Sequence, residues 1–319
     1  MHTRPLGTTT LRVSELGFGA APLGDEYGAI DPRAGERAVA LAVESGINFF
    51  DVAPYYGRTL AEERLGQWLE GRRDRVVLST KVGRYDRDLP DGFDFSAARV
   101  ARSIEESLRR LRTDVIDLCI AHDIEFGRRE DILFETLPAL RALQLQGKIR
   151  YVGISGFPLE HLRDVADAAS VDVILSYCHY DLLNTRLQTV LIPFAVRRGI
   201  GLINASPLHM GVLTRRGPPA WHPAPPHVLQ AGRAAAEFCA ARGVDIAQVA
   251  LSFALSADGV ATTLVGMRSE EEVRATLRAL DAEPDPELTQ SVRALLADVQ
   301  DVEWPVGLPE NNRAVAAYV

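Results

Sequence analysis

The sequence predicts an α/β fold, a closed (β/α)₈ barrel, in one domain that spans residues 1–319. Three observations predict it. A short apolar run, a loop and an amphipathic helical stretch follow one another repeatedly along the chain. Most of the apolar runs are apolar throughout, as expected of parallel strands covered on both faces. No change in composition divides the chain, and barrels of this kind routinely exceed ~250 residues as one unit.

The expected strands are rich in β-branched residues and are bounded by loop residues. They are LGFG (16–19), NFFDV (48–52), RVVLSTK (75–81), VIDLCIAH (115–122), RYVGIS (150–155), VDVILSY (171–177), IGLINAS (200–206) and TTLVG (262–266). Before them, the turn residues GTT lie between RPL and LRV, which predicts a small β-hairpin capping the barrel floor.

A doubly wound sheet is the competing architecture. It normally carries a Gly-rich phosphate-binding fingerprint after its first strand. The segment LGFGAAPLG has a GxG, but its third glycine is misplaced and the residues that follow begin a helix poorly. The barrel is therefore favoured.

Helical stretches are expected between the strands, including 33–45, 61–70, 96–111, 130–146, 159–169 and 187–198. In 96–111 the apolar residues recur at spacings of three and four, and Ser96 precedes them as an N-cap. Ser269 is a second N-cap, with Glu272 three residues later in the pattern of a capping box.

Two segments are too irregular for helices or strands. Residues 213–227 are dense in proline and glycine and follow the seventh strand, at the mouth of the barrel. A loop of this length in a compact domain is usually functional. The tail after residue 300 is similar, and we expect it to fold back over the mouth.

Composition excludes several classes of function. The chain is 47% hydrophobic and carries a net charge of −8, which argues against binding to nucleic acid or to anionic lipid. No apolar run approaches the ~20 residues of a membrane span, and the N-terminus lacks the apolar core of a signal peptide. Three scattered cysteines without CxxC spacing predict neither a disulfide framework nor a metal site. These observations predict a soluble, cytoplasmic protein.

Ionisable residues stand where strands end, at Asp51, Lys81 and His122, and Tyr56 follows shortly after Asp51. Catalytic groups of a (β/α)₈ barrel come from these carboxyl ends. An ammonium favours the phenolate of a nearby tyrosine, an aspartate can fix the lysine, and a histidine can orient a substrate oxygen. Each residue alone is most simply a cap, a solvated side chain or a packing residue. Their coincidence at successive strand ends predicts a proton-transfer site.

Five segments, in order along the chain, resemble the aldo-keto reductase superfamily. They are GINFFDVAPYYG (46–57), STKVG (79–83), AHD (121–123), GKIRYVGIS (147–155) and SPLHMGVL (206–213). The resemblance implies a (β/α)₈ barrel, a nicotinamide cofactor and a catalytic tetrad of Asp51, Tyr56, Lys81 and His122. It implies no metal.

Other segments resemble the family members that oxidise free aldoses such as L-galactose and L-fucose. They include GFDFSAARV (92–100), HDIEFG (122–127), VDVILSYCHY (171–180) and GPPAWHPA (217–224). This likeness implies a dehydrogenase that converts the anomeric carbon of a sugar to a lactone with NAD. Two alternatives stay open: an NADPH-dependent aldehyde or ketone reductase with the same tetrad, and a cofactor-binding regulatory subunit such as those of potassium channels.

The resemblance also assigns the cofactor site. Ser155 would meet the nicotinamide carboxamide, with Gly156 and Ser176 where the family usually has asparagine and glutamine. The pyrophosphate would lie against Ser206, Leu208 and Gly211, and the adenosine end against Gly266, Arg268, Ser269 and Glu272. Glu272 stands where enzymes that prefer NADP often carry arginine, so NAD is the expected cofactor.

The expected substrate is a small sugar, and the residues that flank the predicted mouth are candidates to contact it. They are Tyr27, Tyr55, His122, His179 and Trp221. Trp221 could equally anchor the 213–227 loop. Cys178, beside His179, is interpreted as an inert buried thiol rather than a nucleophile. We expect a monomer or a small homo-oligomer.

Overall fold

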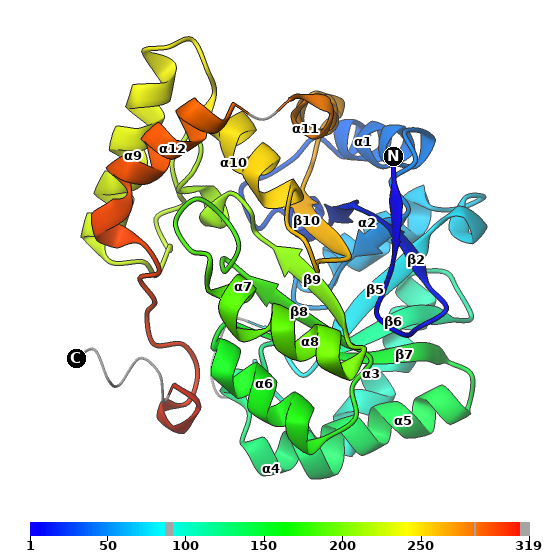
Figure 1. Ribbon diagram of the computed structural model, residues 1–319. Coiled ribbons are helices and arrows are strands. Elements are labelled where there is room, and N and C mark those ends of the chain that lie inside the picture. The colour runs from blue at the N-terminus through cyan, green and yellow to red at the C-terminus, as the bar shows by residue number, and fades with distance from the viewer. Residues whose placement is uncertain (87–91, 284, 313–319) are drawn as a thin grey trace.

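The computed structural model describes residues 1–86, 92–283 and 285–312 and shows a closed barrel of eight parallel strands in the order β10-β3-β4-β5-β6-β7-β8-β9 (Figure 1). The barrel strands are β3 (Leu16–Gly19), β4 (Phe49–Asp51), β5 (Val77–Val82), β6 (Ile116–Ala121), β7 (Ile149–Gly156), β8 (Val173–Tyr177), β9 (Gly201–Ala205) and β10 (Thr262–Gly266). Each coincides with an expected strand, so the barrel prediction is confirmed.

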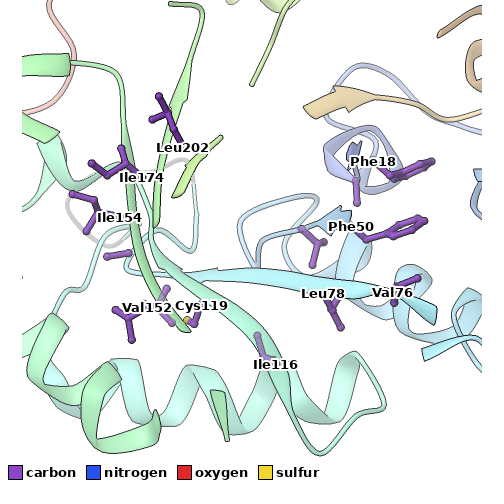
Figure 2. Close-up of a cluster of buried hydrophobic side chains, with 14 of the residues drawn as sticks. Phe18, Phe50, Val76, Leu78, Ile116, Cys119, Val152, Ile154, Ile174 and Leu202 are labelled. Atoms are coloured by element: carbon purple, nitrogen blue, oxygen red, sulfur yellow. The ribbon is translucent and has the colours of Figure 1, made fainter. Parts of the chain in front are cut away.

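Successive residues of each strand face opposite sides of the barrel wall. One set, which includes Phe18, Phe50 and Ile174, packs outward against the helices (Figure 2). The alternate set, which includes Phe49 and Leu175, fills the interior. Because both faces are apolar, the strands show no alternation in the sequence.

The N-terminal hairpin closes one end of the barrel. Strands β1 (Thr3–Pro5) and β2 (Arg12–Ser14) pair antiparallel, with Thr3 opposite Ser14. Leu6, Leu11 and Val13 are buried in the same cluster as the interior strand residues. The hairpin therefore caps the floor as expected, and the carboxyl ends of the strands open at the other end.

The helices surround the barrel (Figure 1). They are α1 (Pro32–Glu44), α2 (Leu60–Trp68), α3 (Ala97–Arg110), α4 (Arg129–Asp131), α5 (Leu137–Leu145), α6 (Leu159–Ala168), α7 (Arg186–Val190), α8 (Ile192–Arg198), α9 (Pro226–Ala240), α10 (Ile246–Leu255), α11 (Glu270–Asp281) and α12 (Pro286–Leu295). Short helical turns are η1 (Ala21–Gly24), η2 (Arg73–Arg75), η3 (Ile124–Phe126), η5 (His209–Gly211), η6 (Ala297–Val299) and η7 (Pro309–Asn311).

Two expected helices are interrupted, and a proline explains each break. The stretch 130–146 contains a π-helical turn, η4 (Ile132–Thr136), between α4 and α5. Pro138 cannot donate to the carbonyl four residues earlier, so the regular ladder is broken there. Pro193 has the same effect between α7 and α8.

Both expected N-caps form. Ser96 accepts a hydrogen bond from the Arg99 N–H, and Ser269 accepts one from the Glu272 N–H. The capping box at Ser269 is incomplete, because the Glu272 carboxylate accepts the N–H of Arg268 instead of that of Ser269.

The tail after residue 300 folds back over the loops at the open end. Trp304 stacks on Phe157, just after β7, with ring centres 4.8 Å apart. The Leu308 N–H donates to the carbonyl of Glu125, after β6, at 2.8 Å. The predicted irregular loop is also present, although α9 begins at Pro226, so the last two residues of the predicted loop are helical.

Among the described residues, no helix is long and apolar enough to cross a membrane. All three cysteines are buried and free.

Candidate active site

Lys81 lies at the centre of the open end, where its ammonium group has three partners. It forms an ion pair with Asp51, donates to the Val52 carbonyl at 2.9 Å and donates to the Tyr56 hydroxyl at 3.2 Å. These partners match the three donors of an ammonium group. The Ser79 hydroxyl also donates to Asp51, at 2.9 Å, so the carboxylate is fixed from a second side.

The turn after β4 holds Tyr56 against Lys81. Gly57 has a left-handed φ of 62°, and a Cβ there would collide with the backbone of Gly24. The Gly57 N–H donates to Glu26 at 2.9 Å. Because the chain passes so close to the loop after β3, this position requires glycine, and the Tyr56 ring is directed into the opening.

Burial and the Lys81–Asp51 pair set the charge states. Burial lowers the pKa of Lys81, but Asp51 and Tyr56 together outweigh burial and raise that pKa above its ordinary value. Burial also raises the pKa of Tyr56 to about 12, although the ammonium of Lys81 opposes this rise. Lys81 is therefore a cation and Tyr56 a neutral phenol near neutral pH.

His122 lies directly after β6 with its ring edge-on to Tyr56, at 5.9 Å between ring centres. Burial lowers its pKa to about 3, so the imidazole is uncharged. Its Nδ1 atom is buried without a hydrogen-bond partner among the described residues. The phenol, the ammonium and the neutral imidazole together can move a proton at one substrate oxygen.

Aromatic residues stand around this site. Tyr55 contacts His122 edge-on at 6.2 Å, and Tyr27 packs against Trp221 at 5.8 Å between ring centres. Trp221 is nevertheless 47% exposed. The Tyr27–Trp221 contact joins the loop after β3 to the loop after β9, so this ring both contacts another loop and stays accessible at the opening.

The residues predicted to bind a cofactor lie at or after the carboxyl ends of β7, β8, β9 and β10. Ser155 is buried and accepts the Asp123 N–H at 3.3 Å. Ser206, Leu208 and Gly211 lie in one loop after β9, where Ser206 and Gly211 have positive φ angles. Gly266, the last residue of β10, is exposed. After it, Ser269 caps α11, and Arg268 donates through its Nε to Glu272 at 3.1 Å.

Comparison with known proteins agrees with this geometry. The Aldo/keto reductase family profile matches residues 15–297. This chain belongs to the aldo-keto reductase family.

Relatives of this aldo-keto reductase include several sugar dehydrogenases. L-galactose dehydrogenase from Arabidopsis thaliana is 43% identical and covers 98% of this chain and 99% of its own. Pyridoxal 4-dehydrogenase from Microbacterium luteolum is 31% identical (85% and 90% covered), and D-arabinose 1-dehydrogenase from Saccharomyces cerevisiae is 30% identical (93% and 95%). A solved aldo-keto reductase from Bacillus halodurans, in its holo form, superposes with a TM-score of 0.78 at 29% identity, covering 98% and 99%.

Ser176 does not face the opening of this aldo-keto reductase. It shares a strand face with Ile174, which packs outward, whereas Leu175 belongs to the interior cluster. Its hydroxyl is hydrogen-bonded to His179 Nδ1 at 3.0 Å, and both residues are fully buried. The expectation that Ser176 contacts the cofactor is corrected: Tyr177 is the residue at the end of β8 that faces inward.

Both ring nitrogens of His179 are likewise hydrogen-bonded within the protein. Its Nε2 is hydrogen-bonded to Glu303 of the tail at 2.9 Å, and Nδ1 is bonded to Ser176, so no ring nitrogen is left for a sugar. Glu303 also forms an ion pair with Arg186. Burial raises the pKa of Glu303, but His179 and Arg186 outweigh it and hold that pKa below its ordinary value. His179 therefore fastens the tail to β8.

Two residues at the opening were missed in the sequence. Arg84, just after β5, forms an ion pair with Asp123 and lies 3.8 Å above the Tyr55 ring centre. Tyr177 lies near the same carboxylate, and burial together with Asp123 raises its pKa well above the ordinary value. In the sequence, an arginine after a strand has no distinguishing neighbour, and the apolar residues before Tyr177 do not show which face of the strand it takes.

Three side chains of metal-ligand type lie together, although none were expected to cluster. The ligand atoms of Cys178, Asp181 and His209 are within 4.8 Å of one another. Asp181 is hydrogen-bonded to His209 Nδ1 at 2.8 Å and accepts the N–H groups of Leu183 and Asn184. Burial raises the pKa of Cys178 well above its ordinary value, so it is a thiol. Hydrogen bonds within the protein hold Asp181 and His209 Nδ1, and the interpretation of Cys178 as a buried thiol fits its burial.

Proposed function

We propose that this protein is an NAD-dependent aldose 1-dehydrogenase, which oxidises the anomeric carbon of a free sugar of the L-galactose or L-fucose type to the aldonolactone. The observation that carries the proposal is the Lys81–Tyr56 hydrogen bond beside an uncharged His122. The 43% identity to L-galactose dehydrogenase over nearly the whole chain supports the substrate class.

The proposed roles follow from the contacts. The sugar presents its C1 hydroxyl to Tyr56 and His122. Before each turnover the Tyr56 phenol loses its proton to solvent, and the ammonium of Lys81, fixed by Asp51, stabilises the resulting phenolate. This phenolate then takes the proton of the C1 hydroxyl, which restores the phenol. His122 holds the C1 oxygen by a hydrogen bond. A bound NAD would supply the acceptor for the hydride lost from C1, so that C1 would become the carbonyl of the lactone.

The residues around the opening fit a dinucleotide. Ser155 lies near the carboxyl end of β7, Ser206 follows β9 and Arg268 follows β10, so hydroxyl groups and a guanidinium lie on neighbouring strands at the open end. Ser206 and Gly211 have left-handed backbones, which is typical of loops that approach a ligand closely. These residues would hold the nicotinamide, the pyrophosphate and the adenosine end in that order.

The charge on Arg268 bears on the choice of cofactor. Glu272 accepts from both the backbone N–H and the guanidinium of Arg268, at 2.9 and 3.1 Å. Arg268 also donates to the Tyr27 carbonyl at 3.3 Å. This guanidinium is thus already paired, and a 2′-phosphate would meet the Glu272 carboxylate beside it. A ribose hydroxyl can instead donate to that carboxylate, so NAD is proposed over NADP.

Initial rates test the proposal. L-galactose, L-fucose and D-arabinose with NAD are compared with a panel of aldehydes and ketones with NADPH. We expect the highest kcat/KM for an L-aldose with NAD, and a lactone as the product. A higher kcat/KM for the aldehydes with NADPH would instead make the protein a carbonyl reductase with the same tetrad.

The free cysteines suit the cytoplasm, and gel filtration distinguishes a monomer from a small homo-oligomer.

A further inference from the structure

Arg84 is held rigidly beside the catalytic histidine. Its guanidinium carbon lies 3.8 Å from the ring centre of Tyr55, 5.4 Å from Phe93 and 5.8 Å from Phe126. Its NH1 group forms the ion pair with Asp123. Aromatic faces attract a guanidinium and leave it few orientations. The position of this cation is therefore determined by the protein itself.

Asp123 is the carboxylate that faces His122. Its Oδ2 atom, which accepts from Arg84, lies 3.7 Å from His122 Nε2. The backbone of Asp123 is left-handed, with φ 51° and ψ 58°, and its N–H donates to Ser155. A non-glycine residue in this conformation costs about 1–3 kcal/mol and persists where its surroundings fix it. The carboxylate thus has little freedom to turn away from the imidazole.

The charged groups around His122 come from several elements. Asp123 favours the protonated imidazole, whereas Lys81 of β5 and Arg84 after β5 oppose it. Tyr55 and Tyr56, from the turn after β4, present neutral rings. At 3.7 Å and in a buried site, an unpaired carboxylate would strongly favour protonation of the histidine. Arg84 is the group that pairs this carboxylate.

We propose that Arg84 is a positioning residue that neutralises Asp123 and thereby keeps His122 an uncharged imidazole. An uncharged His122 can hold the C1 oxygen of the sugar through one hydrogen bond and leave the proton transfer to Tyr56. An imidazolium would compete with Tyr56 as the acid–base group and would add a positive charge beside Lys81. This consequence for catalysis rests on the proposed function, but the charge state of His122 does not.

The first experiment follows His122 directly. The chain has seven histidines, so their ring signals are resolved by NMR, and His122 is assigned from its absence in His122→Asn. In the native protein, we expect no titration of His122 between pH 5 and 8, because burial lowers its pKa to about 3. In Arg84→Met, the unpaired Asp123 carboxylate should raise the pKa of His122, so we expect its ring signals to begin to titrate inside that range.

Matched variants separate charge from packing. Arg84→Lys keeps the cation, so the ring signals of His122 are expected not to titrate between pH 5 and 8. The double variant Arg84→Met/Asp123→Asn removes both charges and is expected to abolish the titration of His122 that Arg84→Met introduces. Arg84→Gln, which keeps a donor for Asp123 without the charge, replaces Arg84→Met if that variant is not folded by circular dichroism. The proposal would be overturned if the His122 ring signals of folded Arg84→Met or Arg84→Gln did not titrate between pH 5 and 8. It would also be overturned if they still titrated in the double variant.

Kinetics provide the second readout. With L-galactose and NAD, log kcat/KM of the native enzyme should rise with pH with a slope of about 1 below pH 7, from Tyr56 alone. In Arg84→Met the slope should approach 2, which amounts to roughly a further tenfold loss one pH unit below the His122 midpoint. Absence of turnover in the native protein would refute the proposed function. The NMR titration alone would then test whether Arg84 keeps His122 uncharged.

Discussion

Replacing Tyr56 with phenylalanine removes one oxygen from the centre of the site. The ring, which packs edge-on against His122, is kept. Lys81 loses one hydrogen bond but keeps Asp51 and the Val52 carbonyl. The stability cost should therefore be about 1 kcal/mol, the usual net value of one hydrogen bond. Catalysis should suffer far more, because the group proposed to accept the substrate proton is gone.

The expected loss in kcat is at least ~10²-fold, which corresponds to about 2.7 kcal/mol of barrier. NADH formation from L-galactose measures kcat, and isothermal titration with NAD shows whether the cofactor still binds with unchanged affinity. Tyr151→Phe is the matched control: its hydroxyl bonds to Thr10 at the barrel floor, so its removal should leave kcat unchanged. Retention of more than about a tenth of kcat by Tyr56→Phe would refute the role given to this phenol.

Three more predictions concern pH, the cofactor and the tail. With the pKa of Tyr56 at about 12, the phenolate fraction grows about tenfold per pH unit, so oxidation should accelerate from pH 7 to 10; a flat profile with chemistry shown to limit the rate would contradict this. The native enzyme should prefer NAD at least about tenfold in kcat/KM, or ~1.4 kcal/mol, and Glu272→Arg should shift the ratio toward NADP; an unchanged ratio would exclude Glu272 as the discriminating residue. His179→Gln should lower the free energy of unfolding, measured in urea, by about 1–3 kcal/mol and leave KM for the sugar unchanged. A raised KM would instead indicate that His179 contacts the substrate.

The barrel could be predicted because its signal is distributed over the whole chain. Eight apolar runs, separated by amphipathic stretches, leave few ways to bury all the strands, and the parallel barrel is one that covers both faces of each. The errors were local. Each break, at Pro138 and at Pro193, came from one missing backbone N–H. The spacing of apolar residues by three and four does not reveal such a break.

The candidate site was predicted less evenly. Asp51, Tyr56, Lys81 and His122 were recognised together, and the structure brings them together. Arg84 was not recognised, because an arginine after a strand has no distinguishing neighbour in the sequence. Its partners, Phe93, Asp123 and Phe126, lie 9 to 42 residues further along the chain, and only the closed barrel brings them to it.

The contrast between Lys81 and Ser176 shows why a strand-end residue is informative only when it is charged. An ammonium on the outer face of the wall would be buried among apolar helices, at a cost of many kcal/mol, so a lysine at this position has to face the open end. A serine hydroxyl needs a single hydrogen bond and loses only about 1–3 kcal/mol without one, so either face accepts it. In β8 the preceding residues Val173, Ile174 and Leu175 are all apolar and reveal no alternation. The side of the barrel that Ser176 faces therefore depends on strand register, which is determined by the pairing of Ser176 with Gly156 and Asn204 in the closed barrel.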